Sequence, residues 1–217
     1  MIRTTVTLFS ACFGIIALGC ILVKQEATAI APEPTTEVLP ADTSAVTLPG
    51  LAAPSLTSSF DARALPAVPP ALIDDETLWL ARAVYSETKR PHEQWLVAWV
   101  IRNRVETGYR GRQTYHDVVL DPFQFSAFNK GNPKRSKYGS LLPTSTVPGW
   151  QRVLRIAHHA RHLDTEYRPF PRATRHFYSE RSLPAGAPVW AEGRAPIYLP
   201  PTFDVEAERF RFFSGVI

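Results

Sequence analysis

The chain has 217 residues, 45% of them hydrophobic, which suits one globular domain with residues left for other segments. Its formal net charge of +4 favours polyanionic surroundings, but the excess is too small and too scattered to choose among nucleic acid, anionic lipid and cell wall. Both cysteines, Cys12 and Cys20, lie in the N-terminal apolar run, which excludes disulfides, thiol catalysis and thiolate metal sites from the rest of the chain.

The N-terminus has the pattern of an export segment. Residues 4–23 carry no charge, Arg3 precedes them and Lys24 follows, and residues 27–29 offer a small-x-small cleavage site. A buried core helix is the alternative. We predict that residues 1–30 are a signal peptide or a membrane anchor. Either one places the remaining chain in the periplasm or at the cell envelope, and an uncleaved segment would anchor it to the inner membrane.

A linker is predicted to follow the export segment. Residues 31–71 are rich in proline, alanine, serine and threonine and cannot bury enough apolar surface to offset the entropy of ordering. Proline keeps such a segment extended, so we expect a disordered spacer between the membrane and the domain. The folded domain is then predicted to span residues 72–217.

Within this domain, apolar periodicity predicts four helices, at residues 74–87, 91–107, 115–120 and 148–163. Residues 121–146 are polar and are predicted to form a loop. After Pro171 the segments are short and rich in aromatic residues, which indicates strands or ordered loops. Helices followed by short extended segments predict a small, mainly helical α+β domain with short C-terminal strands.

One carboxylate lies on the apolar face of the first predicted helix. Glu87 shares that face with Leu80, Ala83 and Val84. A carboxyl group held against apolar side chains has a raised pKa, so it can keep a proton near neutral pH and donate it as a general acid. The alternative is an ordinary glutamate at a helix end, exposed to solvent or paired with Lys89 or Arg90.

Three blocks that include Glu87 resemble the SleB-type cell wall hydrolases, the spore-cortex lytic enzyme family. The first block is Tyr85-Ser86-Glu87 with Glu93-Gln94 and Asn103-Arg104-Val105, the second is "DPFQFSAF" (121–128), and the third is "RATRHFYS" (172–179) followed by Trp190. The closing "FRFFSG" is similar to the terminal aromatic strand of that family. The resemblance covers residues 74–214. The turn "TKRPH" after Glu87 is shorter than is usual in the family and lacks its glycine.

The resemblance implies cleavage of peptidoglycan glycan strands between N-acetylmuramic acid and N-acetylglucosamine. It also implies the reaction of a lytic transglycosylase, in which a single acid, Glu87, is sufficient. Most glycosidases need two carboxylates, but here the 6-hydroxyl of the muramoyl sugar attacks its own C1 and gains from proximity. Glycan strands are the expected partner and no cofactor is expected. Nucleic acid is not expected, because only the net charge favours it.

The same resemblance suggests six substrate-binding residues. Gln124 and Ser126 are expected to bind N-acetyl groups or sugar hydroxyls, or alternatively to cap a turn. Phe125, Tyr178 and Trp190 are expected to stack on sugar rings, or alternatively to pack in the core. His176 is expected to orient Glu87, or alternatively to satisfy a buried hydrogen bond.

Two other functions compete with glycan cleavage. His158, His162 and Glu166 have helical spacing and would suit a zinc-dependent amidase, but the chain lacks His-Glu-x-x-His and the helix is expected to end before Glu166. We therefore predict no metal site. A non-catalytic peptidoglycan-binding module is the second alternative, and the altered turn after Glu87 motivates it.

Overall fold

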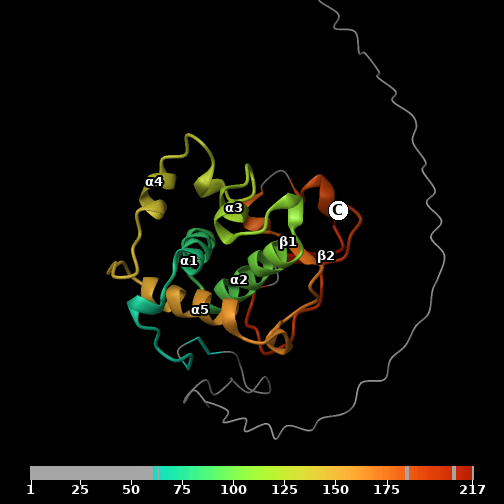
Figure 1. The fold of residues 1–217 in the computed structure, drawn as a ribbon. Coiled ribbons are helices and arrows are strands. Elements are labelled where there is room, and N and C mark those ends of the chain that lie inside the picture. Colours follow the sequence, from blue (N-terminus) through green and yellow to red (C-terminus); the bar gives the residue numbers. More distant parts are fainter. Residues whose placement is uncertain (1–60, 63, 184–185, 207–208, 217) are drawn as a thin grey trace, which may run out of the picture. The chain divides into compact units, whose positions relative to one another are not determined.

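The computed structural model describes residues 61–62, 64–183, 186–206 and 209–216 (Figure 1). The predicted export segment and most of the predicted linker, residues 31–60 and 63, lie outside these ranges. Within them, no helix has the length and apolar character needed to cross a membrane.

The described part of the chain is mainly helical, with a two-stranded sheet near its C-terminus, as predicted. Its helices are α1 (Asp75–Glu87), α2 (Pro91–Glu106), α3 (Tyr115–Leu120), α4 (Lys134–Gly139) and α5 (Trp150–His162). Strands β1 (Thr174–Tyr178) and β2 (Arg211–Ser214) pair antiparallel, with His176 opposite Phe213. The loop prediction was wrong at α4, a single short helix that buries none of its residues and so leaves no apolar period in the sequence.

Helix α1 is capped at its start and interrupted soon after its end. The side chain of Asp74 accepts a hydrogen bond from the backbone N–H of Thr77 at 2.9 Å, which satisfies one of the free donors of the first turn. The helix ends at Glu87, and α2 begins at Pro91, whose missing N–H costs little at the first helical position. Glu87 therefore lies at the last position of α1, immediately before a tight turn.

The core forms where α1, α2 and α5 pack against one another (Figure 1). Trp99 of α2 and Trp150 of α5 are both fully buried within it. The core also includes Ala62 and Leu65, and His159 of α5 hydrogen-bonds the carbonyl of Pro66 at 3.1 Å. Packing thus begins upstream of residue 72, where the sequence put the start of the domain.

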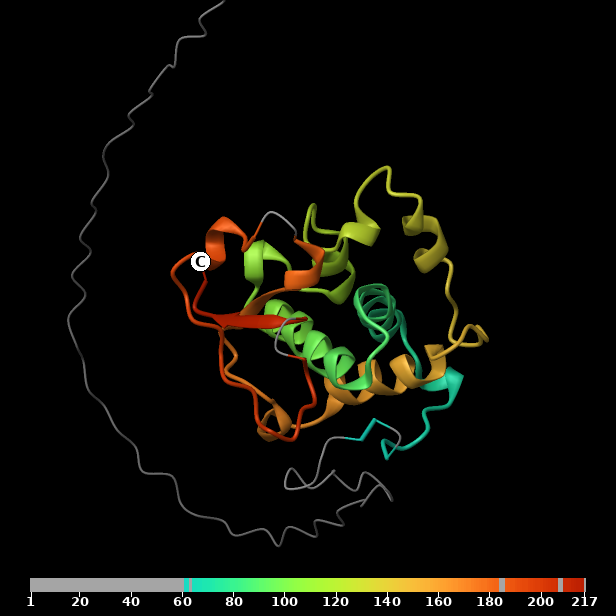
Figure 2. The same cartoon turned by 180° about the vertical axis from the view of Figure 1, so that it is seen from behind.

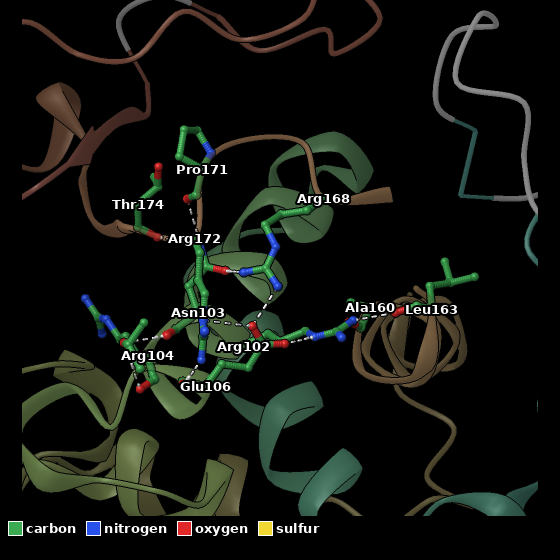
Figure 3. Close-up of polar contacts among 11 residues, drawn as sticks. Arg102, Asn103, Arg104, Glu106, Ala160, Leu163, Arg168, Pro171, Arg172 and Thr174 are labelled. Carbon is green, nitrogen blue, oxygen red and sulfur yellow. Dashed lines mark hydrogen bonds and ion pairs between the residues drawn. The ribbon is translucent and has the colours of Figure 1, made fainter. Parts of the chain in front are cut away.

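The sheet lies beside α2 (Figure 2). Side-chain hydrogen bonds attach it to the C-terminal half of that helix (Figure 3). Asn103 donates from Nδ2 to the carbonyls of Pro171, at 3.2 Å, and Thr174, at 2.8 Å. Arg168 donates to Asn103 and to Glu106, with 2.6 Å to the carboxylate. These contacts fix the start of β1 against α2, and so fix the position of the residues that follow in β1.

Candidate functional site

A cleft of about 360 Å³ contains Glu87 in its wall. Five segments that are distant in sequence form it: the end of α1, the last turn of α2, residues 123–126, the chain from β1 into the following turn, and Arg209 with Phe210 just before β2. Helix α2 brings these walls together, because its side chains hydrogen-bond both β1, at Thr174, and the turn that follows Glu87, at Thr88.

Glu87 is partly exposed as a residue, but its carboxyl group is buried deeply enough to have a perturbed pKa. Burial raises the pKa of Glu87 to about 7, and the charge of Arg104 offsets only part of this effect. Among the described residues, the side chain of Glu87 has no hydrogen bond or ion pair, although the charge of Arg104 acts on it. A pairing of Glu87 with its basic neighbours is not found: Lys89 donates to the carbonyl of Tyr85, and Arg90 pairs with Glu206. Near neutral pH the side chain can therefore hold a proton that faces the cleft.

The turn after Glu87 is held by two buried polar residues of α2. Glu93 accepts a hydrogen bond from the Thr88 hydroxyl, and Gln94 donates from Nε2 to the Thr88 carbonyl at 2.9 Å. Arg209 reaches Glu93 from the opposite wall, with 2.7 Å between Nε and Oε1. Glu93 and Gln94 thus fix the backbone at Thr88, next to Glu87, and tie that end of the cleft to the chain before β2.

Of the six residues predicted to bind substrate, three line the cleft together with Glu87: Gln124, Ser126 and Tyr178. The other three, Phe125, His176 and Trp190, do not line it. Phe125 is only 1% exposed and belongs to the core. Trp190 packs against Tyr178 and Phe213, with ring centroids 5.8 and 5.4 Å away.

His176, the remaining predicted residue that does not line the cleft, is buried near Arg104. Its Nε2 lies 2.8 Å from the hydroxyl of Tyr109, and its ring is 5.0 Å from that of Trp190. Burial, with a smaller contribution from the charge of Arg104, lowers the pKa of His176 to about 4. His176 is therefore neutral at physiological pH, and its ring contacts Tyr109 and Trp190 rather than Glu87.

Sequence reasoning missed Arg104 as part of the site. Arg104 lines the cleft, although only 4% of it is exposed. Its Nε donates to the carbonyl of Arg175 at 2.7 Å, and its guanidinium lies 5.4 Å from the Phe125 ring and 5.6 Å from the Tyr109 ring. The signal was present, since Arg104 belongs to the quoted Asn-Arg-Val block and stands within a helix predicted to be buried.

Phe123 was also missed. It lines the cleft, is 87% exposed, and has a backbone φ of 65°, which is rare for a bulky residue. The side chain of Asn129 holds this conformation by accepting the Phe123 N–H at 2.9 Å. Three phenylalanines fall within residues 123–128, and neither period 2 nor period 3.6 indicates which of them faces outward.

No group of three or more His, Cys, Asp or Glu side chains is arranged to hold a metal ion anywhere in the described ranges. The rings of His158 and His162 are 4.4 Å apart, but α5 ends at His162, so Glu166 is not on the same helix.

Comparisons with protein-family models, with curated proteins and with solved structures give no match for the chain.

The described lining of the cleft contains one carboxyl group, Glu87, together with three arginines, neutral polar groups and aromatic rings. Such a site can donate one proton and take it back, while hydroxyls, amides and rings hold a polar, ring-shaped substrate. It does not supply the second carboxylate that a standard hydrolytic glycosidase requires.

Proposed function

We propose that the protein cleaves the glycan strands of peptidoglycan between N-acetylmuramic acid and N-acetylglucosamine, as a lytic transglycosylase with Glu87 as its acid. The observation that carries the proposal is a lone carboxyl group in a cleft with its pKa raised to about 7. The resemblance of the three sequence blocks to SleB-type cell wall hydrolases supports the same assignment.

The reaction needs only one carboxyl group. Glu87 donates its proton to the glycosidic oxygen as the bond from C1 breaks, and N-acetylglucosamine leaves as the alcohol. The 6-hydroxyl of the muramoyl sugar attacks C1 and returns a proton to Glu87, which leaves a 1,6-anhydro ring and the original enzyme. The nucleophile belongs to the substrate, so proximity replaces a second side chain. The charge of Arg104 stabilises the Glu87 carboxylate that exists between the two proton transfers.

The remaining wall residues bind the sugars. Gln124 and Ser126 supply hydrogen bonds to N-acetyl groups and hydroxyls, and Tyr178 and Phe123 offer rings on which sugars stack. The three predicted residues that do not line the cleft support residues that do. Trp190 packs against Tyr178, and Phe125 and His176 lie next to Arg104. An export segment at residues 1–30 would deliver the domain to the cell wall, where a formal charge of +4 is favourable.

The direct test incubates the protein with purified sacculi and identifies the released products by mass spectrometry. We expect anhydro-muropeptides from the parent protein and a loss of at least a hundredfold in their release from Glu87→Gln, since general acid catalysis typically contributes about 10²–10⁴. Glu166→Gln is the matched control, because it makes the same change at an exposed residue that does not line the cleft.

Each competing function gives a different product. Reducing sugar ends indicate hydrolysis, free peptides that disappear with EDTA indicate an amidase, and binding without release indicates a non-catalytic module. Unchanged release of anhydro-muropeptides from Glu87→Gln would remove Glu87 from the reaction.

A further inference from the structure

The cleft around Glu87 carries more positive than negative charge. Its lining includes Arg104, Arg181 and Arg209, whereas Glu87 is its only acidic member in the described ranges. Two of these arginines are already matched. Arg209 pairs with buried Glu93, at 2.7 Å, and Arg181 pairs with Glu206, at 2.7 Å.

Arg104 is not matched in the same way. It donates one hydrogen bond, from Nε to the Arg175 carbonyl, and its Nη1 is buried without a partner among the described residues. An unpaired donor on a buried charged group is costly, and such a group in a cleft wall is satisfied when a ligand supplies the acceptor. A guanidinium suits a carboxylate best, because two parallel N–H groups match its two oxygens.

The charged neighbours of Arg104 leave it without a stable counter-charge. Asp121 is held by Arg110, at 2.7 Å, and by Arg112, at 3.1 Å. His176 on β1 is neutral, since burial lowers its pKa to about 4. The Arg175 side chain, also on β1, is itself positive and donates to the carbonyl of Val216 at 3.0 Å.

Two further groups near Arg104 are acids: the phenol of Tyr109 and the carboxyl of Glu87. Tyr109 is engaged with His176 through its hydroxyl. Glu87 is neutral in the protonated form that the proposed reaction requires. The cleft therefore has an uncompensated positive charge in the state that binds substrate.

We propose that Arg104 binds a carboxylate carried by the substrate, so that the cleft selects glycan strands bearing a carboxylate beside the cleaved bond over neutral glycans. This inference rests on the proposed function. Two sources could supply the carboxylate: the lactyl group of N-acetylmuramic acid, which is free in strands without peptide, and the peptide that otherwise occupies that group. A neutral N-acetylglucosamine oligomer has neither.

The test measures binding to the full-length Glu87→Gln protein, which keeps the neutral form of the acid and is not expected to consume the ligand. The ligands are peptide-free glycan strands, peptide-bearing strands and N-acetylglucosamine oligomers of equal length. We expect a carboxylate-bearing strand to bind about tenfold tighter than the neutral oligomer, the effect of one charge-assisted hydrogen-bonded contact. Preference for peptide-free strands assigns the lactyl group, and preference for peptide-bearing strands assigns the peptide.

Arginine variants then locate the effect. Arg104→Gln in the Glu87→Gln background should remove the preference, whereas Arg172→Gln, a side chain 58% exposed that does not line the cleft, should keep it. Arg104→Lys retains the charge but not the planar fork, so it should keep part of the preference; circular dichroism checks that each variant is folded. The comparison of ligands on Glu87→Gln alone needs no arginine change, so it stands even if Arg104→Gln does not fold.

A pH series gives an independent readout. For N-acetylmuramic acid, which has no glycosidic bond to cleave, affinity for the parent protein should fall several-fold as pH rises through 7. Ionised Glu87 would then compete with the ligand for Arg104, and Glu87→Gln should show no such fall.

Equal binding of neutral and carboxylate-bearing glycans overturns this inference, and so does a preference that survives Arg104→Gln. Neither result affects the proposed cleavage, which the products from sacculi test separately. Failure to bind any glycan overturns both.

Discussion

Arg104 and Glu87 line one cleft, and the pKa of Glu87 is raised to about 7 because burial outweighs the attraction of the Arg104 charge. In the proposed reaction, burial favours the protonated acid at the start, and Arg104 favours the carboxylate once the proton has been given. The two effects together allow Glu87 to exchange a proton in both directions near neutral pH.

The first prediction concerns the pH dependence of product release. In the proposed reaction Glu87 must be protonated to act, so release from sacculi should be highest below pH 7 and fall about tenfold per pH unit well above it. In Arg104→Lys, the pH above which release falls should stay near 7. In Arg104→Gln this pH should be higher, because the charge that lowers the pKa of Glu87 is gone. Initial rates from pH 5 to 9 measure both effects. If this pH is not higher in Arg104→Gln, the coupling is contradicted.

The second prediction concerns stability. The folded-state pKa of Glu87, about 7, lies above its ordinary value of 4.5, so the folded protein holds this proton more tightly than the unfolded chain does. The associated stability is fully present below pH 4.5 and is lost as pH rises to 7, by up to about 3 kcal/mol. Glu87→Gln removes this titration. We expect it to be more stable than the parent at pH 8, with the difference vanishing toward pH 4.

Urea unfolding of both proteins at several pH values measures the second prediction. All other groups titrate alike in the two proteins, so the difference between their curves isolates Glu87. A parent protein more stable than Glu87→Gln at pH 8 would show that the protein stabilises the ionised form of Glu87, whereas we expect burial to destabilise that form.

The third prediction compares a buried and an exposed ion pair. Glu93 is fully buried and depends on Arg209, so Arg209→Gln should leave a buried, uncompensated carboxylate and reduce stability by about 3 kcal/mol. Arg90→Gln makes the same change in the exposed pair with Glu206 and should have little effect. Urea unfolding at pH 7 measures both. Adding Glu93→Gln to Arg209→Gln should restore much of the loss, since the lone charge is then removed.

The sequence predicted those parts of the fold that have an apolar period. Helices α1, α2, α3 and α5 were all predicted because each buries side chains at helical spacing, whereas α4 buries none and was missed. For the site, Glu87 was found because a carboxylate interrupts an apolar stripe. Arg104 belongs to a quoted block within a helix predicted to be buried, but the pattern alone does not say that this residue faces the same cleft as Glu87, which lies on another helix.

The loop at residues 121–128 shows the same limit at the level of single rings. The motif there predicted Phe125 as a sugar-stacking residue, yet Phe125 is buried and Phe123 faces the cleft. Which ring points outward is decided by the backbone at Phe123, with its φ of 65°, and by the hydrogen bond from its N–H to Asn129. Neither feature follows from residue type.

The fourth prediction separates these two phenylalanines by what each change should affect. Phe123→Ala removes an exposed ring from the cleft, so we expect weaker binding of glycan strands, by roughly fivefold to tenfold for a lost stacking contact, with stability almost unchanged. Phe125→Ala opens a cavity in the core beneath Arg104 and should reduce the free energy of unfolding by about 3–5 kcal/mol. Binding to the Glu87→Gln background and urea unfolding, measured for both variants, give the comparison. Asn129→Ala, which releases the backbone of Phe123 while leaving its ring in place, should weaken binding in the same direction as Phe123→Ala. If Phe125→Ala weakened binding and left stability intact, the assignment of the two rings would be reversed.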